Sequence, residues 1–448
     1  MPEKCLLTTS LAPDHSMKFF IHTFGCQMNL SDSEHLAGML LASGMRVSPS
    51  AEKSDLIIVN TCAVREKSEE KLYSLLGRLE YLKKTKGTKI GIVGCVAQLQ
   101  KSKLWQKKPF LDFIVGPDNY GKIPEIVHSH SGEKVLLTGW DPEWHEQSPL
   151  QIERGSKASA YISIMEGCDN FCSYCVVPYT RGREKYRSIS SILKEAEELA
   201  SRGYKEIQLL GQNVNSYCDP DTGISFASLL KEIDNITGIQ WIRFITSHPK
   251  NFTDEIAYAM KELPKVCHQL HLPVQSGSTS VLQRMKRGYT REDYLRKIDL
   301  LRKLMPDIHL STDIIVGFPG ETEVEFQETL SLLSKIQYTN IFSFRYSPRP
   351  FTAASKMEDS VPFQEKKSRL IQVQELQKEI QRKKNKSAIG HTQKVLCTGT
   401  SKKDPHVYAG RNAGYQVVNF TSPKNVLDQF IRVRILSCGP YSLSGEAA

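Results

Sequence analysis

Three closely spaced cysteines, Cys168, Cys172 and Cys175, give the chain its most informative pattern, C-x3-C-x2-C. Three thiolates can hold three irons of a [4Fe-4S] cluster and leave the fourth iron open to a cofactor. A structural zinc site is the alternative, but such sites are usually closed by four ligands, and the next cysteine in the chain is Cys218. The spacing therefore predicts an iron–sulfur cluster that takes part in chemistry.

A second set of three cysteines is spread over the first part of the chain. Each one follows an apolar run that reads as a β-strand, and helical patterns separate the runs, which is typical of a doubly wound parallel sheet. The carboxyl ends of parallel strands share one edge, where ligands bind. Buried structural cysteines are the alternative, but burial alone does not put each cysteine at the same point after its strand. We therefore predict a second three-cysteine [4Fe-4S] site, with the strands 18–24, 56–59 and 90–93 leading to Cys26, Cys62 and Cys95.

Three further elements complete this first domain. A fourth strand is predicted over 113–115, and a charged helix over 65–84. Another helix is predicted over 31–43, because Ser31 and Glu34 have the spacing of a capping box, in which an N-cap hydroxyl and a glutamate satisfy the first backbone N–H groups.

The cysteine pattern, with Tyr174 before its last cysteine, resembles that of the radical S-adenosylmethionine (SAM) superfamily. After a linker at about 138–157, six strand–helix repeats follow, which predict a full or partial TIM-like (β/α)6 barrel. Such a barrel has its active site at the carboxyl ends of the strands. The predicted strands are 161–165, 206–210, 241–245, 269–272, 309–316 and 341–346.

Polar residues and glycines gather at those strand ends. Each motif alone is weak, because glycine and asparagine are ordinary turn residues, but several on one face beside a metal motif indicate a binding site. Asp313 and His248 also fit barrel-interior residues with satisfied hydrogen bonds. The candidate SAM contacts are Gly211, Gln212, Asn213, Ser247 and Asp313.

Composition narrows the class of protein. A chain of 448 residues suggests about two to three domains, and the net charge of +10 favours a polyanionic partner such as RNA. The odd count of eleven cysteines, with no signal-peptide pattern at the start, indicates a reducing cytoplasm. No apolar run approaches the ~18 residues of a membrane-spanning helix. We expect residues 1–16 to be a disordered tail, with Met17 as an alternative start.

The end of the chain is basic. Residues 387–448 hold seven Lys or Arg and three Asp or Glu, an excess of four positive charges. Strand-like runs over 394–398, 407–411, 415–420 and 430–436 follow a helical run over 364–386 and predict a small β-barrel. With Tyr408, Tyr415 and Phe420 available for stacking, the barrel suits RNA; a structural cap is the alternative.

From Met17 onward the motifs resemble the methylthiotransferase family. The runs at 211–217 and 346–350 point to the branch that acts on N6-(dimethylallyl)adenosine in tRNA. Phe351 departs from the family, which usually has glycine there, and this change bears on the loop near the substrate. The matching runs are 25–29, 60–62, 94–95, 167–184, 210–217, 246–249, 271–278 and 313–322.

The resemblance implies three domains and a reaction. The domains are a methylthiotransferase N-terminal domain over 17–135, a radical SAM core over 154–384 and a TRAM-like RNA-binding domain over 387–448. The reaction would insert sulfur into a C–H bond at C2 of the adenosine next to the anticodon, and then methylate it. Cys168, Cys172 and Cys175 would hold the cluster that reduces SAM, and the other trio would hold a cluster that presents sulfur.

The resemblance also implies the partners. They are two [4Fe-4S] clusters, two SAM molecules per turnover, a tRNA anticodon stem-loop and an electron donor such as flavodoxin or ferredoxin, and we expect a cytoplasmic monomer; the sulfur donor is unknown. The same chemistry on threonylcarbamoyl-adenosine in tRNA or on an aspartate of ribosomal protein S12 remains an alternative. So do a non-catalytic Fe–S RNA-binding protein and sulfur insertion into a small molecule. Cys5, Cys218, Cys267, Cys397 and Cys438 have no assigned role.

Overall fold

The computed structural model describes residues 16–448 except 64–65, 130–131, 142–151 and 153. The chain divides into two compact units, Met1–Glu153 and Arg154–Ala448, which are described separately below. Residues 1–15 of the expected tail and most of the expected linker lie outside the described residues. No described helix is long and apolar enough to cross a membrane.

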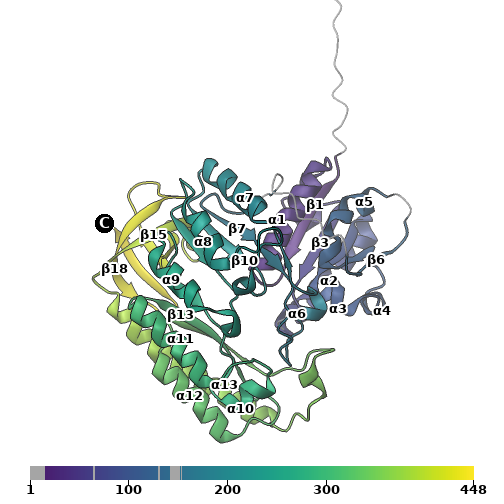
Figure 1. Ribbon diagram of the computed structural model, residues 1–448. Helices are drawn as coiled ribbons and strands as arrows, with labels where there is room; N and C mark the ends of the chain where they lie inside the picture. The colour runs from purple at the N-terminus through teal and green to yellow at the C-terminus, as the bar shows by residue number, and fades with distance from the viewer. Residues whose placement is uncertain (1–15, 64–65, 130–131, 142–151, 153) are drawn as a thin grey trace, which may run out of the picture. The chain divides into compact units, whose positions relative to one another are not determined.

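The first unit is built on a six-stranded parallel sheet, which confirms the predicted fold class (Figure 1). The strand order β2-β1-β3-β4-β5-β6 changes direction between β1 and β3, and ligands bind at such a switch point in open α/β sheets. β3 is buried along its whole length, as expected for a strand covered on both faces. The strands are β1 Lys18–Thr23, β2 Arg46–Val47, β3 Leu56–Thr61, β4 Lys89–Gly94, β5 Phe113–Val115 and β6 Val135–Leu137.

Two helices of this unit, α1 and α3, start close behind the ends of strands β1 and β4. α1 covers Gln27–Ala42, so the capping box predicted at Ser31 is wrong: Cys26 is the N-cap, and Ser31 is buried one turn inside the helix. Likewise, α3 begins at Cys95 itself, immediately after β4. The remaining helices are α2 Glu66–Lys86, α4 Lys103–Lys107 and α5 Ile123–His128.

The second unit opens with six parallel strands in two three-stranded sheets, β11-β10-β7 and β12-β13-β14. A parallel bridge between Ile242 and Val266 continues the hydrogen bonding from β11 toward β12. The result is the partial barrel that the six repeats predicted. The strands are β7 Ser159–Ser163, β10 Glu206–Leu210, β11 Trp241–Phe244, β12 Gln269–His271, β13 His309–Val316 and β14 Asn340–Arg345.

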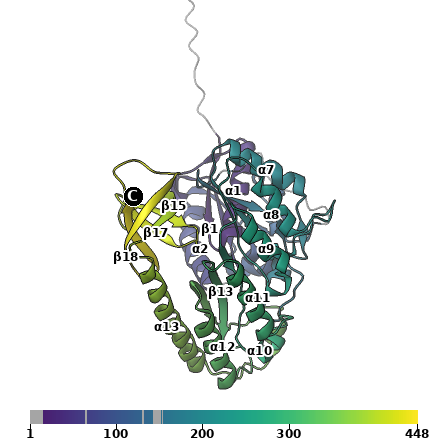
Figure 2. The same cartoon turned by 60° about the vertical axis from the view of Figure 1, so that its left-hand side comes forward.

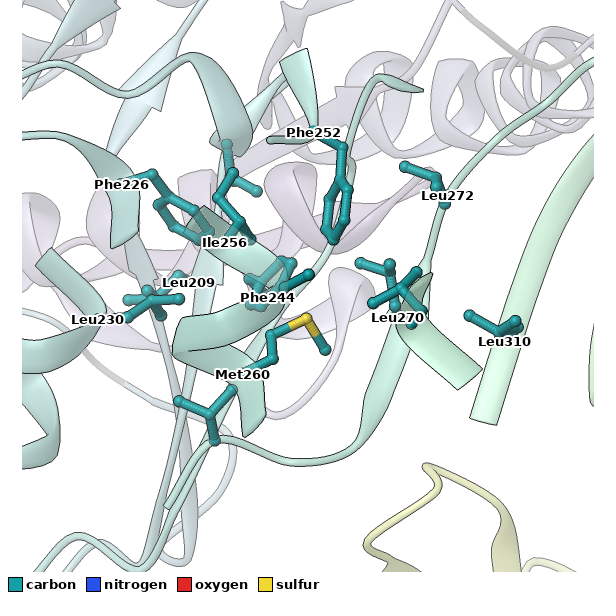
Figure 3. Packing of buried hydrophobic residues seen from close by; sticks show 14 of the residues in the cluster. Leu209, Phe226, Leu230, Phe244, Phe252, Ile256, Met260, Leu270, Leu272 and Leu310 are labelled. Atoms are coloured by element: carbon teal, nitrogen blue, oxygen red, sulfur yellow. The ribbon is translucent and has the colours of Figure 1, made fainter. Parts of the chain in front are cut away.

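Amphipathic helices cover the outside of these strands, following one another around the curve (Figure 1). Thr290 caps α11 through a complete capping box with Asp293. Figure 3 shows the core between strands and helices, where Phe226, Phe244 and Met260 pack together. The helices are α7 Ile189–Ser201, α8 Phe226–Asp234, α9 Asp254–Glu262, α10 Thr279–Arg284, α11 Arg291–Leu304 and α12 Glu323–Ile336.

The long helix α13, Phe363–Ser387, leads into a closed five-stranded barrel in the order β15-β16-β17-β19-β18 (Figure 2). Sequence reasoning predicted four of the strands and missed β19. The barrel core contains Val395, Val418, Val433 and Leu443. The strands are β15 Thr392–Thr400, β16 Tyr408–Asn412, β17 Val417–Thr421, β18 Phe430–Cys438 and β19 Ser442–Ala447.

This barrel docks on the amino ends of β10 and β11 through Arg243. The guanidinium donates to Glu206 at 2.6 Å, to the Ala413 carbonyl at 2.7 Å and to the Asn412 carbonyl at 2.8 Å. Trp241 adds an edge-to-face contact with Phe430 at 4.6 Å between ring centroids. Since strand carboxyl ends carry the active site, the barrel holds on to the opposite end of these strands.

The three aromatic residues of the small barrel that were expected to stack on RNA are engaged within the protein instead. Phe420 is only 1% exposed and belongs to the barrel core. Tyr408 packs against it, with ring centroids 5.9 Å apart. Tyr415 donates to Gln208 at 3.1 Å and lies against Arg243 and Arg411. These three rings stabilise the barrel and its docking.

Candidate functional site

The cysteine loop follows β8, Met165–Glu166, which pairs with β9, Lys185–Tyr186. Gly167 starts the loop with a φ of +81°, and a Cβ there would lie 2.0 Å from the Arg183 carbonyl oxygen, so only glycine fits. The Cys168 N–H donates to the Gly182 carbonyl at 3.2 Å. The loop is therefore pinned to the chain segment that returns toward β9.

The three thiols of this loop are wholly or partly removed from solvent. Cys172 is buried, and Cys168 and Cys175 are half-buried. Burial raises the pKa of Cys168, and burial together with the charges of Cys172 and Cys168 raises the pKa of Cys175 to about 12. The three thiols belong to one short loop, 168–175, and metal binding is what deprotonates such buried thiols.

Two nitrogen atoms lie close to the sulfur of Cys172. Nη1 of Arg287 donates to it at 3.2 Å, and Nε2 of His248 lies 3.7 Å away. Burial, with the charges of Arg287 and Lys250, lowers the pKa of His248 to about 2, so the ring is neutral. Because its Nδ1 accepts from the Lys250 N–H at 3.2 Å, its one proton is on Nε2 and points to the sulfur.

Arg287 itself is 4% exposed. Its other hydrogen bonds go to the Tyr289 hydroxyl at 3.0 Å, the Tyr174 hydroxyl at 3.3 Å and the Pro273 carbonyl at 2.7 Å. Within the described part of the chain no carboxylate pairs with this guanidinium. Since a buried cation needs an opposite charge, the arrangement suits a Cys172 sulfur that is anionic when it holds iron.

Unsatisfied polar atoms mark the ends of the neighbouring strands. Oδ1 of Asn213, Oγ of Ser247 and Oε1 of Gln275 are buried and have no hydrogen-bond partner among the described residues. They follow β10, β11 and β12, respectively. A buried polar atom without a partner is costly, so three at one end of the barrel fit a ligand with several polar groups, such as the amino acid part of SAM.

Two of the other predicted SAM contacts support the cysteine loop. Oε1 of Gln212 accepts from the Gly167 N–H at 2.5 Å, so this side chain already has a partner. Gly211 is needed because a Cβ there would lie 2.6 Å from the sulfur of Met165. The backbone N–H groups of Gln212 and Asn213 also point to that sulfur, at 3.2 and 3.4 Å.

Asp313 lies in the middle of β13 and faces the inside of the partial barrel. Its Oδ1 is 3.5 Å from Nε2 of His271, and its register partner on β14 is Phe342. The carboxylate is partly exposed, unlike the buried residues on the opposite face of the strand. It can therefore reach a ligand in the barrel, although it lies deeper along its strand than Asn213 or Ser247.

Sequence reasoning missed Arg287, Gln275 and Asn251. Asn251 accepts from the side-chain amides of Asn170 and Asn213, at 3.4 and 3.1 Å, and so joins the cysteine loop to the end of β10. Gln275 has a φ of +75°, a left-handed conformation that is costly for a residue with a side chain and that clusters at active sites and ligand-binding segments. A signal for Gln275 was present, because it lies three residues after the predicted strand 269–272.

The second cysteine trio lies in the first unit, at the carboxyl ends of β1, β3 and β4. Gly25 brings two of the segments together: a Cβ there would lie 2.7 Å from the Cβ of Cys62. The Cys26 thiol donates to Asn29 at 3.3 Å, and Asn29 donates to Asn60 at 2.9 Å. This buried amide network fixes the loop before α1 against the end of β3.

The close packing at this edge of the sheet extends to the end of β4. A Cβ at Gly94, the residue before Cys95, would lie 2.4 Å from Oδ1 of Asn60. Cys62 and Cys95 are buried and Cys26 is half-buried. Among the described residues, no three Cys, His, Asp or Glu side chains are arranged to hold a metal ion as they stand. The fit of both trios to iron therefore rests on their thiol donors, their burial and the loops that carry them.

Residues 162–333 match the family model described as Radical SAM superfamily, and residues 18–116 match the one described as Uncharacterized protein family UPF0004. Both matches include one cysteine trio each.

Near-full-length relatives share one name, tRNA-2-methylthio-N(6)-dimethylallyladenosine synthase. The protein of Geobacter metallireducens is 45% identical over 96% of this chain and 98% of its own length. That of Acetivibrio thermocellus is 44% identical over 96% of this chain and 90% of its own. That of Clostridium novyi is 43% identical over 99% of both.

Solved structures with a similar fold are more distant. The radical S-adenosylmethionine methyltransferase TsrM from Kitasatospora setae has a TM-score of 0.56 and 16% identity, over 76% of this chain and 75% of that one. The cobalamin-dependent S-adenosylmethionine radical enzyme OxsB has a TM-score of 0.52 and 14% identity, over 82% of this chain and 56% of that one. At these identities the likeness shows the fold alone.

Proposed function

We propose that this chain, which belongs to the family of tRNA-2-methylthio-N(6)-dimethylallyladenosine synthases, converts N6-(dimethylallyl)adenosine beside the tRNA anticodon to its 2-methylthio derivative. The observation that carries the proposal is the match over nearly the whole chain to relatives of that name. The chain is accordingly a radical SAM enzyme, a class that uses a [4Fe-4S] cluster and SAM.

We assign the six cysteines of the two trios to two separate [4Fe-4S] clusters. Cys168, Cys172 and Cys175 would hold the cluster that meets SAM, and Cys26, Cys62 and Cys95 would hold a second one. When bound, cluster and SAM supply the radical that an unactivated C–H bond requires. One SAM would be used for that radical and another for the methyl group. The donor set supports this, because Cys thiolates are the usual ligands of Fe–S clusters.

The residues of the chain bind and orient the reactants. Arg287 and His248 direct N–H groups to the Cys172 sulfur and so stabilise its negative charge. Asn213, Ser247 and Gln275 offer unpaired polar atoms to SAM, and Asp313 would contact it or the substrate from inside the barrel. Gly211 and Gln212 hold the strand end against the cysteine loop.

The proposal extends to partners and domain roles. Residues 17–135 would carry the sulfur-presenting cluster, residues 154–384 the radical chemistry and residues 387–448 part of the RNA contact. The positive net charge supports a tRNA substrate. We further propose that the protein is a cytoplasmic monomer that takes electrons from a flavodoxin or ferredoxin.

Mass spectrometry of tRNA nucleosides from cells lacking the protein tests the substrate. We expect the 2-methylthio nucleoside to disappear and N6-(dimethylallyl)adenosine to accumulate. An unchanged profile for this nucleoside, with loss of a methylthio group from threonylcarbamoyl-adenosine or from ribosomal protein S12, would favour the neighbouring branches. No change in any of these would favour a binding protein without catalysis.

A further inference from the structure

Phe351 combines an exposed aromatic side chain with a left-handed backbone conformation. Its side chain is 60% exposed, and its backbone has a φ of +69°. Residues with a Cβ adopt this left-handed conformation at an energetic cost. Glycine would avoid that cost, and so a bulky aromatic ring that faces solvent from such a position calls for a role outside the core.

The loop around Phe351 is anchored without help from its ring. The Ala354 N–H donates to the Ser173 carbonyl at 2.7 Å, which ties the loop to the segment between Cys172 and Cys175. Thr352 is 1% exposed and donates to the Arg349 carbonyl at 2.7 Å. Ala354 packs in a cluster that does not include Phe351. The backbone thus places the ring beside the cysteine loop and leaves it in solvent.

A second exposed ring accompanies Phe351. Tyr179, in the short helix α6, Val177–Thr180, is 38% exposed, and its ring centroid lies 6.0 Å from that of Phe351 at an interplanar angle of 34°. α6 begins two residues after Cys175. Arg183 lies a few residues further on, with 72% of its side chain exposed and an exposed ion pair to Asp169. Such a pair is weak and can give way to a phosphate.

We propose that Tyr179 and Phe351 form a stacking subsite for a base of the tRNA substrate, next to the modified adenosine. This inference rests on the proposed function. An adenosine can reach the cysteine side of the barrel only when the surrounding loop of the RNA is splayed open, and proteins hold such unstacked bases on aromatic rings. The exposed Arg183 and the net charge of +10 supply the charge complementarity that RNA requires.

The position of Phe351 allows stacking to be separated from folding. Phe351→Gly removes the ring and relieves the positive φ, so we expect a thermal midpoint equal to or above that of the wild-type protein. The dissociation constant for an anticodon stem-loop RNA carrying N6-(dimethylallyl)adenosine should rise about tenfold. Tyr179→Ala should weaken binding similarly, and the double variant should add little, since the rings form one platform. Tyr258→Ala, an exposed ring on the outer helix α9, is the control and should leave binding unchanged.

Further variants distinguish stacking on RNA from simple space filling and from a protein–protein contact. Phe351→Tyr should retain affinity, whereas Phe351→Leu should lose it, because leucine fills space without an aromatic face. Unchanged dissociation constants in Phe351→Gly and Tyr179→Ala, with normal wild-type binding and product formation, would overturn the subsite and leave the function standing. Loss of self-association by light scattering, with RNA affinity unchanged, would make the pair a protein contact and also overturn it. If the wild-type protein does not bind the RNA, both the function and the subsite fail.

Discussion

Arg287 and Cys172 are separated by 115 residues in the chain, yet the guanidinium lies 3.2 Å from the sulfur, and both groups are buried. Hydrogen bonds and positive charge at the ligating sulfurs of an Fe–S cluster raise its reduction potential. If Cys172 holds the proposed cluster, this contact would let the core of the barrel tune the reduction potential of that cluster.

Replacing Arg287 should therefore make the cluster harder to reduce. We expect a more negative potential in Arg287→Gln, by about 60 mV if the contact is worth roughly 1.4 kcal/mol to a one-electron couple. Arg287→Lys keeps the charge and should shift the potential less. An EPR-monitored redox titration of the reconstituted protein measures this. Equal potentials in all three proteins, with full iron content, would show that Arg287 only packs.

Arg243 should be a large contributor to the stability of the second unit. Its guanidinium is fully buried between Glu206 and the carbonyls of the small barrel. Arg243→Met leaves the Glu206 charge buried and unpaired, which costs about 3–5 kcal/mol. Thermal unfolding should show a large loss in Arg243→Met and a partial recovery in Arg243→Met/Glu206→Gln. Arg296→Met, which breaks a surface pair with Asp293, is the control and should change little.

The docking through Arg243 also changes how RNA binding by the small barrel must be tested. Deleting residues 387–448 would expose Arg243 and Trp241, so a truncated protein would lose stability as well as RNA contacts. Charge substitution avoids this. Arg432 and Arg434 are exposed on β18, and their replacement leaves the core untouched.

Arg432→Gln/Arg434→Gln should weaken tRNA binding and make it less sensitive to salt. Each lost phosphate contact reduces the slope of log K against log salt by about 0.7–0.9. Fluorescence anisotropy at several salt concentrations measures the slope. A slope and affinity equal to those of the wild-type protein would leave the barrel as a structural cap.

Some of this structure could be read from the sequence. Strand 309–316 was predicted to the residue, and in the structure it alternates half-buried and buried positions along its whole length. The polar residues at the strand ends followed from the rule that parallel strands share one functional edge.

Other features depend on contacts that no local pattern encodes. The start of α1 is set by the loop at Cys26, so the capping-box spacing at Ser31 was misleading. Phe420 points inward because the barrel closes, and closure also relies on β19, which pairs in parallel with β17. Arg287 reaches Cys172 only through the fold, and its position after α10 carries no signal of that contact.

Iron content tests the two trios separately. Anaerobic reconstitution should give about eight irons per chain, and Cys26→Ala/Cys62→Ala/Cys95→Ala should retain about four. Cys218→Ala removes an exposed thiol outside both trios and should change nothing. If the wild-type protein also stops at about four irons, the second site does not exist.

The most direct test of the account follows the reaction in Cys172→Ala and Cys62→Ala with tRNA, SAM and a reductant. Nucleoside mass spectrometry and deoxyadenosine release are measured together. We predict that Cys172→Ala forms neither deoxyadenosine nor product, because the cluster that meets SAM is lost. Cys62→Ala should still release some deoxyadenosine but form no 2-methylthio nucleoside. Methylthiolated tRNA from Cys62→Ala would contradict the central claim, since the sulfur would then come from elsewhere.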